Sequence, residues 1–445
     1  MKLEYTLNDN KNGLVVTGGK DLEGELIIPS EDSFEGKIYP VTAIGDWAFW
    51  GCKALTSIVI PDSVTEIGDW AFYGCSVLTS IVIPDSVTKI GDYAFRGCRA
   101  LTSIEIPNSV TEIGTWAFED CSALTSIVVD KENEHYDSRE GCNAIIKSDT
   151  NTLVAGCSTT LIPDSVTEIG DWAFIDCTSL ASIVIPDSVT EIGYRAFSGC
   201  KALTSVVVDK ENEHYDSREG CNAIIKSDTN KLVAGCSTTL IPDSVTEIGD
   251  YAFEHCRSLI SIVIPDSVTK IGEEAFYGCS ALNSIVIPDS VTEIGDWAFI
   301  DCTSLASIVI PNSVTEIGYG AFSGCSALTS VVIPDSVTKI GEEAFRGCKA
   351  LTSIEIPNSV TEIRTGAFED CSALTSIVIP DSVTKIGDCA FEDCSALTSV
   401  VIPDSVTKIG DGAFMRCDAL ASIVINDASL LKGASVPKGV KIVKP

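Results

Sequence analysis

A 23-residue repeat constrains this chain more than any other feature of its sequence. The dipeptide Ala-Phe recurs fourteen times between Phe49 and Phe414, and successive copies lie 23 residues apart except for two intervals of 56 residues. Periods of about 20 to 50 residues are typical of solenoids, in which each unit buries its apolar side only by stacking on its neighbours. The 445 residues are therefore predicted to form one stacked array rather than the roughly three globular domains expected for that length.

The first half of each unit predicts a short strand. In one copy, Leu55, Ile58 and Ile60 follow the L-x-x-L-x-L spacing of a leucine-rich repeat. Because side chains alternate along a strand, Ile58 and Ile60 should point inward and Val59 outward. Pro61 then ends the strand, since it has no N–H to donate to a ladder.

The second half of the unit predicts a second extended segment followed by a short helix or turn. Ile67 is an inward residue of that extended segment, and Asp69 is placed to cap a helix that runs to about Cys75 with Phe72 on its buried face. The position of Gly68 is glycine in thirteen of the fourteen units, which indicates a backbone geometry that is costly for a Cβ atom. Arg364 is the exception, and strain is expected there.

The repeat array spans residues 44–425, and both of its ends require caps because an open stack exposes its core. Residues 1–43 are predicted to form the N-terminal cap and residues 426–445 the C-terminal cap. The two 56-residue units contain near-identical inserts at about residues 130–162 and 209–241. Each insert is predicted to form a β-hairpin, since two short apolar runs flank a polar turn.

Charge and composition exclude several classes of function. The chain has 30 Lys and Arg against 63 Asp and Glu, a formal net charge of −33. It therefore lacks the clustered cations that nucleic acids and anionic membrane surfaces require. No apolar run approaches the roughly 20 residues needed to cross a bilayer, and the first residues, Met1–Tyr5, do not form the apolar stretch of a signal peptide.

The repeated sequence Leu-Thr-Ser-Ile-Val-Ile-Pro-Asp-Ser-Val-Thr-Glu-Ile-Gly-Asp-Trp-Ala-Phe, as at residues 55–72, resembles the BspA-type leucine-rich repeat of bacterial and protist surface proteins. The resemblance covers roughly residues 44–425, and the two inserts also resemble an insertion found in that family. It implies a leucine-rich repeat solenoid in a cell-surface or secreted protein that binds host or matrix proteins. A non-enzymatic, adhesin-like or receptor-like binding module is our first hypothesis, and a structural rod or fibre subunit that self-assembles is the alternative.

A column of exposed valines is the first candidate binding face. It comprises Val59, Val82, Val128, Val184, Val207, Val263, Val286, Val309 and Val332 and continues at Val378, Val401 and Val424, with Glu105 and Glu355 as interruptions. Contiguous exposed apolar surface usually marks an interaction site. The alternative interpretation is that valine simply suits a strand.

A column of aromatic residues is the second candidate, as an anchor for a protein or glycan partner. It comprises Trp47, Trp70, Tyr93, Trp116, Trp172 and Trp297. The same column holds Arg195, Glu274 and Gly366 elsewhere, which indicates that it faces outward. The alternative is that each ring only covers the neighbouring unit.

Fourteen of the 19 cysteines occupy one repeat column, where a small buried hydrophobe is expected and a free thiol is the default interpretation. In a hairpin with a two-residue turn, Cys142 would face Cys157, and Cys221 would face Cys236. Both a disulfide and buried free thiols stay open for these pairs. Cys389 replaces a freely varying residue and is predicted to be an exposed thiol that could link two molecules.

The sequence offers little for catalysis or for a bound metal or cofactor. The chain has three His, and His135 and His214 lie in the inserts without a second nucleophile or ligand set nearby. Stacked Asp residues such as Asp62 could recruit Ca²⁺, but Asp after Pro also favours a turn, and Asn replaces it at 108, 312 and 358. We expect no cofactor, no metal and no enzymatic activity.

Overall fold

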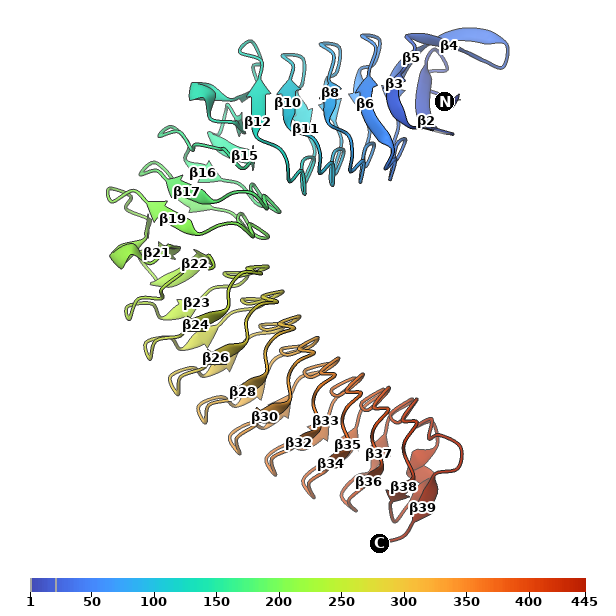
Figure 1. The fold of residues 1–445 in the computed structure, drawn as a ribbon, viewed down its shortest axis with the longest axis vertical. Coiled ribbons are helices and arrows are strands. Elements are labelled where there is room, and N and C mark those ends of the chain that lie inside the picture. The colour runs from blue at the N-terminus through green and yellow to red at the C-terminus, as the bar shows by residue number, and fades with distance from the viewer. Residues whose placement is uncertain (1, 21) are drawn as a thin grey trace. The chain divides into compact units, whose positions relative to one another are not determined.

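In the computed structural model, which describes residues 2–20 and 22–445, the chain is a β-solenoid of about 19 turns with almost no helix (Figure 1). The described residues form two compact units. Unit 1 contains the described residues up to 203 together with 207–214, and unit 2 contains residues 204–206 and 215–445. The predicted solenoid of leucine-rich repeats is confirmed.

The first strand of each regular turn, strand A, contains the Ser-Ile-Val motif or a close variant. These strands are β6 (Leu55–Val59), β8 (Ser80–Val82), β10 (Ser103–Ile106), β12 (Ser126–Val129), β17 (Ser182–Ile185), β19 (Ser205–Val208), β24 (Ser261–Val263), β26 (Ser284–Val286), β28 (Ser307–Val309), β30 (Ser330–Val332), β32 (Ser353–Glu355), β34 (Ser376–Val378), β36 (Ser399–Val401) and β38 (Ser422–Val424). They fall into several short sheets, within which neighbours pair in parallel and in register, as Ile58 does with Ile81 and Val59 with Val82.

The second strand, strand B, is a two-residue segment that ends in isoleucine. These strands are β7 (Glu66–Ile67), β9 (Lys89–Ile90), β11 (Glu112–Ile113), β16 (Glu168–Ile169), β18 (Glu191–Ile192), β23 (Glu247–Ile248), β25 (Lys270–Ile271), β27 (Glu293–Ile294), β29 (Glu316–Ile317), β31 (Lys339–Ile340), β33 (Glu362–Ile363), β35 (Lys385–Ile386) and β37 (Lys408–Ile409). They also pair in parallel, as Ile67 does with Ile90.

The segment that follows strand B is a succession of reverse turns of the backbone rather than the predicted short helix. Trp70 has a left-handed backbone with φ of 58°, which a right-handed helix cannot contain. Its N–H donates to the carbonyl of Asp92 in the next turn at 2.8 Å, and the N–H of Phe72 donates to the carbonyl of Ala94 at 2.7 Å. The turn segments therefore form a third ladder, and hydrogen bonds between turns of the solenoid replace the bonds within a helix.

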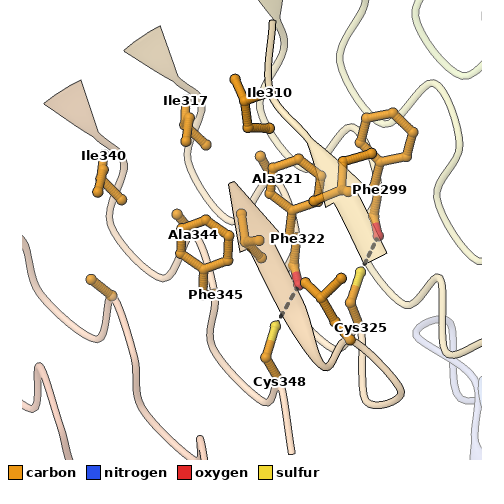
Figure 2. Close-up of a cluster of buried hydrophobic side chains, with 14 of the residues drawn as sticks. Phe299, Ile310, Ile317, Ala321, Phe322, Cys325, Ile340, Ala344, Phe345 and Cys348 are labelled. Atoms are coloured by element: carbon orange, nitrogen blue, oxygen red, sulfur yellow. Dashed lines mark hydrogen bonds between the residues drawn. The ribbon is translucent and has the colours of Figure 1, made fainter. Parts of the chain in front are cut away.

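Phenylalanine rings of successive turns stack in the core, without interruption in unit 2 and with a break between Phe118 and Phe174 in unit 1. In unit 2, Phe299, Phe322 and Phe345 are fully buried, with ring centroids 5.4 and 5.6 Å apart (Figure 2). The column cysteines lie beside this stack, and the thiol of Cys325 donates to the carbonyl of Phe299 at 3.2 Å. The buried column cysteines therefore act as small core residues that satisfy a phenylalanine carbonyl of the preceding turn.

The glycine column exists because consecutive turns approach each other too closely for a Cβ atom. A Cβ on Gly91 would lie 2.6 Å from the backbone nitrogen of Asp69. The N–H of Gly91 also donates to the carbonyl of Ile67 at 2.8 Å. Arg364 takes the place of this glycine in one unit. The strand B ladder is interrupted there, since it stops at β31 and begins again at β33. Among the described residues, the N–H of Arg364 has no acceptor.

The two ends of the array differ from its regular turns. At the N-terminal end, β1 (Lys2–Leu7) and β2 (Leu14–Lys20) form an antiparallel hairpin that joins β5 (Lys37–Ile44), and β4 (Glu31–Phe34) also pairs with β5. β3 (Gly24–Ile27) pairs with β6 in the strand A position. At the other end, η3 (Ala428–Leu431) precedes β39 (Lys441–Val443), which pairs with β38.

Each insert forms a hairpin that joins the strand B sheet. The first contains β13 (Tyr136–Asp137), η1 (Arg139–Gly141), β14 (Ala144–Lys147) and β15 (Thr152–Gly156), and the second contains β20 (Tyr215–Asp216), η2 (Arg218–Gly220), β21 (Ala223–Lys226) and β22 (Lys231–Gly235). β15 pairs with β14 on one side and with β16 on the other. The hairpin therefore supplies one irregular turn of the solenoid.

Candidate binding surfaces

The valine column is an exposed apolar stripe on the outer face of strand A. The exposed fraction of its side chains runs from 44% at Val59 to 81% at Val263, and Val424 is half-buried. Strand pairing places successive members side by side, as with Val263 and Val286 or with Val309 and Val332. Glu105 and Glu355 are also exposed and lie beside Val128 and Val378. We call this surface the valine stripe.

Four further residues extend the valine stripe that the sequence pattern predicted. Ile27 lies beside Val59, and Val443 lies beside Val424. Leu161 and Leu240 are 74% and 70% exposed and occupy the corresponding position at the end of each insert. The signal was present in the sequence Leu-Ile-Pro, which matches the Val-Ile-Pro that ends a regular strand A. The inserts therefore do not interrupt the apolar character of this face.

Strand B differs from strand A in the chemistry of its exposed position. Its exposed position is also in a strand, yet the structure fills it with glutamate or lysine. These side chains form ion pairs across the ladder, as Lys270 does with Glu293 at 2.9 Å and Lys231 with Glu247 at 2.8 Å. Strand propensity would favour valine at both positions, so the two faces differ in chemistry, one apolar and the other charged.

The aromatic column lies on the turn ladder, and its rings contact rings of neighbouring turns in stacked, tilted or edge-on arrangements. The ring centroids of Trp70 and Tyr93 are 3.9 Å apart, and those of Tyr93 and Trp116 are 4.8 Å apart. Trp47 is 60% exposed at the end of this series. In unit 2, Trp297 packs against Tyr319 with centroids 4.9 Å apart. The column thus combines contacts between turns with partly exposed ring surface.

All members of this column have a left-handed backbone, which the sequence pattern did not reveal. The values of φ are 55° at Trp47 and Trp116, 54° at Trp172 and 52° at Trp297. Glycine adopts this conformation without the penalty that a Cβ atom brings. Gly320 and Gly366 in the same column are therefore conformationally suited to it.

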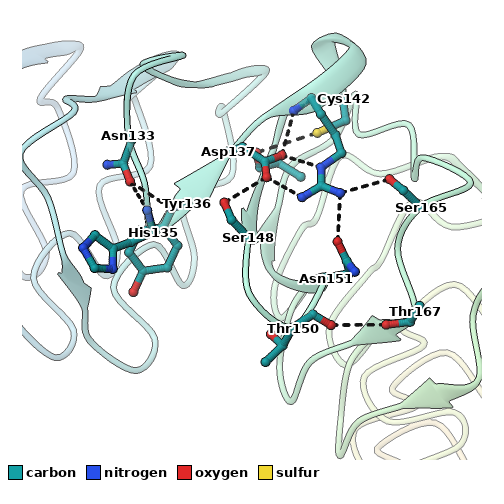
Figure 3. Close-up of polar contacts among 12 residues, drawn as sticks. Asn133, His135, Tyr136, Asp137, Cys142, Ser148, Thr150, Asn151, Ser165 and Thr167 are labelled. Carbon is teal, nitrogen blue, oxygen red and sulfur yellow. Dashed lines mark hydrogen bonds and ion pairs between the residues drawn. The ribbon is translucent and has the colours of Figure 1, made fainter.

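A charged clamp fixes each insert hairpin. Arg139 donates from Nε to Asp137 at 2.7 Å and from an Nη atom to Asn151 at 2.8 Å, and Ser148 donates to Asp137 at 3.0 Å (Figure 3). Burial opposes ionisation of Asp137, but these hydrogen bonds outweigh it and hold the pKa of the carboxyl below its usual value. His135 is exposed outside this network. The same clamp recurs at Arg218 in the second insert, where His214 is also exposed.

The four hairpin cysteines are free thiols, and the hairpin register differs from the predicted one. A bulge between Ile145 and Ile146 shifts the pairing, so that Ile145 lies opposite Ala155. Cys142 and Cys157 therefore do not face each other as a regular two-residue turn requires, and their thiols donate to the carbonyls of Ala144 and Asn143. Cys221 and Cys236 repeat this arrangement.

Cys389 lies in the left-handed aromatic column and is partly exposed. A hydrogen bond with Glu392 and then burial raise the pKa of its thiol to about 11. Eleven of the fourteen column thiols are buried, and burial raises the pKa of one of them, Cys371, to about 12. Cys389 is therefore the more accessible of the two.

We expect iodoacetamide at pH 8 to alkylate Cys389 before buried column thiols such as Cys325 in the native protein. Only the thiolate reacts, so labelling of Cys389 should accelerate as the pH rises toward 11. Peptide mass spectrometry measures each site, with the guanidinium-unfolded protein as the fully labelled control. Equal native labelling rates at Cys325 and Cys389 would contradict the burial of the column.

Neither a metal centre nor a membrane span emerges from the part of the chain that the structure describes. There, no three His, Cys, Asp or Glu residues are grouped so that they could hold a metal ion. No helix within residues 2–20 and 22–445 has the length and apolar character to span a membrane.

A family model for the BspA type leucine rich repeat region matches the chain at residues 39–147, 153–222, 224–352 and 321–432. The chain belongs to this family. Among solved structures, this BspA-type protein is similar to a leucine rich cell surface protein from Faecalibacterium prausnitzii A2-165. The two share 33% sequence identity over 84% of this chain and 92% of the other, with a TM-score of 0.50.

A second similar structure is a leucine-rich repeat protein from Eubacterium ventriosum. It shares 26% identity with the BspA-type chain, over 88% of this chain and 92% of the other, with a TM-score of 0.54. No protein in a search of curated proteins matches this chain.

Proposed function

We propose that this BspA-type protein is a non-enzymatic binding module at a cell surface, and that the valine stripe contacts a protein partner. The observation that carries the proposal is the row of exposed apolar side chains that strand pairing aligns within each strand A sheet, as from Ile27 through Val59 to Val82. Contiguous apolar surface on an acidic protein marks an interaction site. The similar protein from Faecalibacterium prausnitzii is described as a cell surface protein, which supports the proposed location.

The chain itself supplies a conservative way to disrupt the stripe. Glu105 and Glu355 occupy stripe positions in strands that keep their parallel pairing. A variant with Val286→Glu, Val309→Glu and Val332→Glu should therefore keep the fold while it breaks the apolar row. We expect at least about a tenfold loss of affinity for a protein partner, or about 1.4 kcal/mol. Binding is measured on immobilised collagen, laminin and fibronectin.

A matched control carries the same number of substitutions on strand B. A variant with Lys270→Glu, Glu293→Lys and Glu316→Lys changes exposed strand residues on the charged face, and its affinity should stay within about twofold of the wild type. Equal affinity of the stripe variant and the wild type would refute the proposal. Light scattering across a concentration series, with and without reductant, tests the self-assembling rod: stripe-dependent oligomers in place of a monomer would favour that alternative.

A further inference from the structure

The first insert leaves the turn ladder of unit 1 incomplete. Residues 96–128 and 346–378 differ at only three of 33 positions, so the second copy shows what the same sequence does in a regular array. There, the N–H of Phe368 donates to the carbonyl of Ala390 at 3.0 Å, and the N–H of Asp370 donates to the carbonyl of Glu392 at 2.8 Å. Gly366 likewise donates to the carbonyl of Asp388 at 2.9 Å.

In the first copy the corresponding donors are Trp116, Phe118 and Asp120. Within residues 2–20 and 22–445, these three N–H groups donate no backbone hydrogen bond. The cause is the hairpin, which supplies only the end of β15 where a regular unit has a complete turn segment. Gly156 takes the position of the phenylalanine, and its N–H donates to the carbonyl of Ala173 at 2.8 Å.

The far side of this gap carries acceptors instead of donors. The carbonyls of Asp171 and Ile175 receive no hydrogen bond from any described residue, although the equivalent carbonyls of regular turns do. Phe118 retains 8% exposure, whereas its counterpart Phe368 is fully buried. The insert has therefore opened two facing walls of the ladder, one with unused N–H groups and one with unused carbonyls.

A pocket of about 440 Å³ occupies this gap, a size within the about 300–1,000 Å³ range of small-molecule sites. Trp116 and Trp172 line it, with ring centroids 4.6 Å apart and ring planes inclined at 62° in an edge-on contact. Lys147, Glu168 and Glu119 contribute polar lining. The exposed fraction of Glu119 is 7%, and its Oε2 atom lies 2.9 Å from Nε of Arg96.

The lining selects a neutral, polyhydroxylated ligand. Burial raises the pKa of Glu119 to about 7, against the opposing effect of Arg96. Glu168 and Asp171 outnumber Lys147, so the walls disfavour an anion. An extended peptide alternates N–H and carbonyl groups along each edge. Here one wall offers only unused N–H groups and the other only unused carbonyl groups, so the edge of a peptide matches neither wall. A hydroxyl group can both accept from an N–H and donate to a carbonyl.

We propose that the pocket lined by Trp116 and Trp172 binds a neutral saccharide. Its hydroxyl groups accept from the N–H groups of Trp116 and Phe118, which line the pocket, and donate to the carbonyls of Asp171 and Ile175 on the opposite wall. Its apolar ring face packs on an indole, which supplies rigid contact area. This site is separate from the valine stripe, so it adds a second ligand class to the proposed protein-binding module.

Calorimetry and tryptophan fluorescence test the proposal with hexasaccharides of glucose, xylose, mannose and N-acetylglucosamine, and with oligogalacturonate as the anionic comparison. We expect at least one neutral hexasaccharide to bind with a Kd below about 1 mM. Trp116→Ala and Trp172→Ala should each weaken that Kd by at least about tenfold. Trp297→Ala is the matched control, because it removes a ring of the same column where the ladder is regular, and it should leave the Kd within about twofold.

A deletion variant tests the role of the gap itself. Removal of residues 130–162 joins Val129 to Pro163 and converts the 56-residue unit into a 23-residue one. This variant should keep its β-sheet circular dichroism and lose saccharide binding, whereas removal of residues 209–241 should leave binding intact. If the first deletion does not fold, the two tryptophan variants decide.

Three results would overturn the proposal. They are absence of binding by every neutral hexasaccharide at about 10 mM, preference for oligogalacturonate, and undiminished binding after loss of Trp116 or of the insert. The Val286→Glu, Val309→Glu and Val332→Glu variant should bind the saccharide like the wild type, so failure of one proposal leaves the other testable.

Discussion

Replacing Phe322 by alanine is expected to lower the free energy of unfolding of unit 2 by about 3–5 kcal/mol. The ring is fully buried and stacks on Phe299 and Phe345, with centroids 5.4 and 5.6 Å away. Its removal leaves a cavity between two turns that cannot collapse, because three hydrogen-bonded ladders fix the spacing of the turns. Guanidinium unfolding followed by circular dichroism measures the loss.

Phe118→Ala is the matched control for this substitution. Phe118 stacks on Phe95 with centroids 5.6 Å apart, but on its other side it borders the pocket and retains 8% exposure. We therefore expect it to cost less than Phe322→Ala. Because repeat arrays can unfold in parts, hydrogen exchange of the turns around each site should accompany the global measurement. An equal cost at both positions would contradict the packing difference.

Arg364→Gly is expected to stabilise the protein by about 1–3 kcal/mol. Arg364 occupies the glycine column, where a Cβ atom meets the backbone of the preceding turn, and the strand B ladder is interrupted at this position. In the near-identical first copy, Gly114 is present and its N–H donates to the carbonyl of Ile90 at 2.8 Å. The substitution should restore the equivalent bond to Ile340 and relieve the crowding. Equilibrium unfolding measures the change.

The reciprocal variant, Gly114→Arg, should destabilise the protein by a similar amount. A Cβ atom at this position would lie 2.4 Å from the backbone nitrogen of Asp92. If Arg364→Gly is no more stable than the wild type, the interruption of the strand B ladder has another cause. Gly68→Ala provides a milder comparison, because it adds only the Cβ atom at a regular position.

Much of the fold could be predicted because the repeat acts as an internal alignment. Residues such as Ile58 and Phe72 recur where burial demands them, and the glycine at position 68 recurs where turns approach each other. The helix predicted after Asp69 was wrong, since residues that can cap and form one turn of helix also suit a succession of turns. The left-handed backbone at Trp70 decides between the two.

The candidate sites were predicted only in part. The valine column was visible as a pattern, but its extension by Leu161 and Leu240 depends on where the inserts rejoin the array. A regular two-residue turn would place the hairpin cysteines opposite each other. A bulge between Ile145 and Ile146 shifts the register of the two strands, so the cysteines do not face each other. The pocket lined by Trp116 and Trp172 had no sequence signal of its own, because backbone N–H groups form it as much as side chains do.

The sequence by itself determined the solenoid, its core columns and the acidic surface with one apolar row, because each turn repeats the same burial pattern. Tertiary structure alone decided which backbone groups find partners. Residues 116–120 and 366–370 differ only at Trp116 and Gly366, yet the second segment is hydrogen-bonded to the next turn and the first faces a pocket. The physical reason is that a ladder bond depends on the neighbouring turn, which local sequence does not specify.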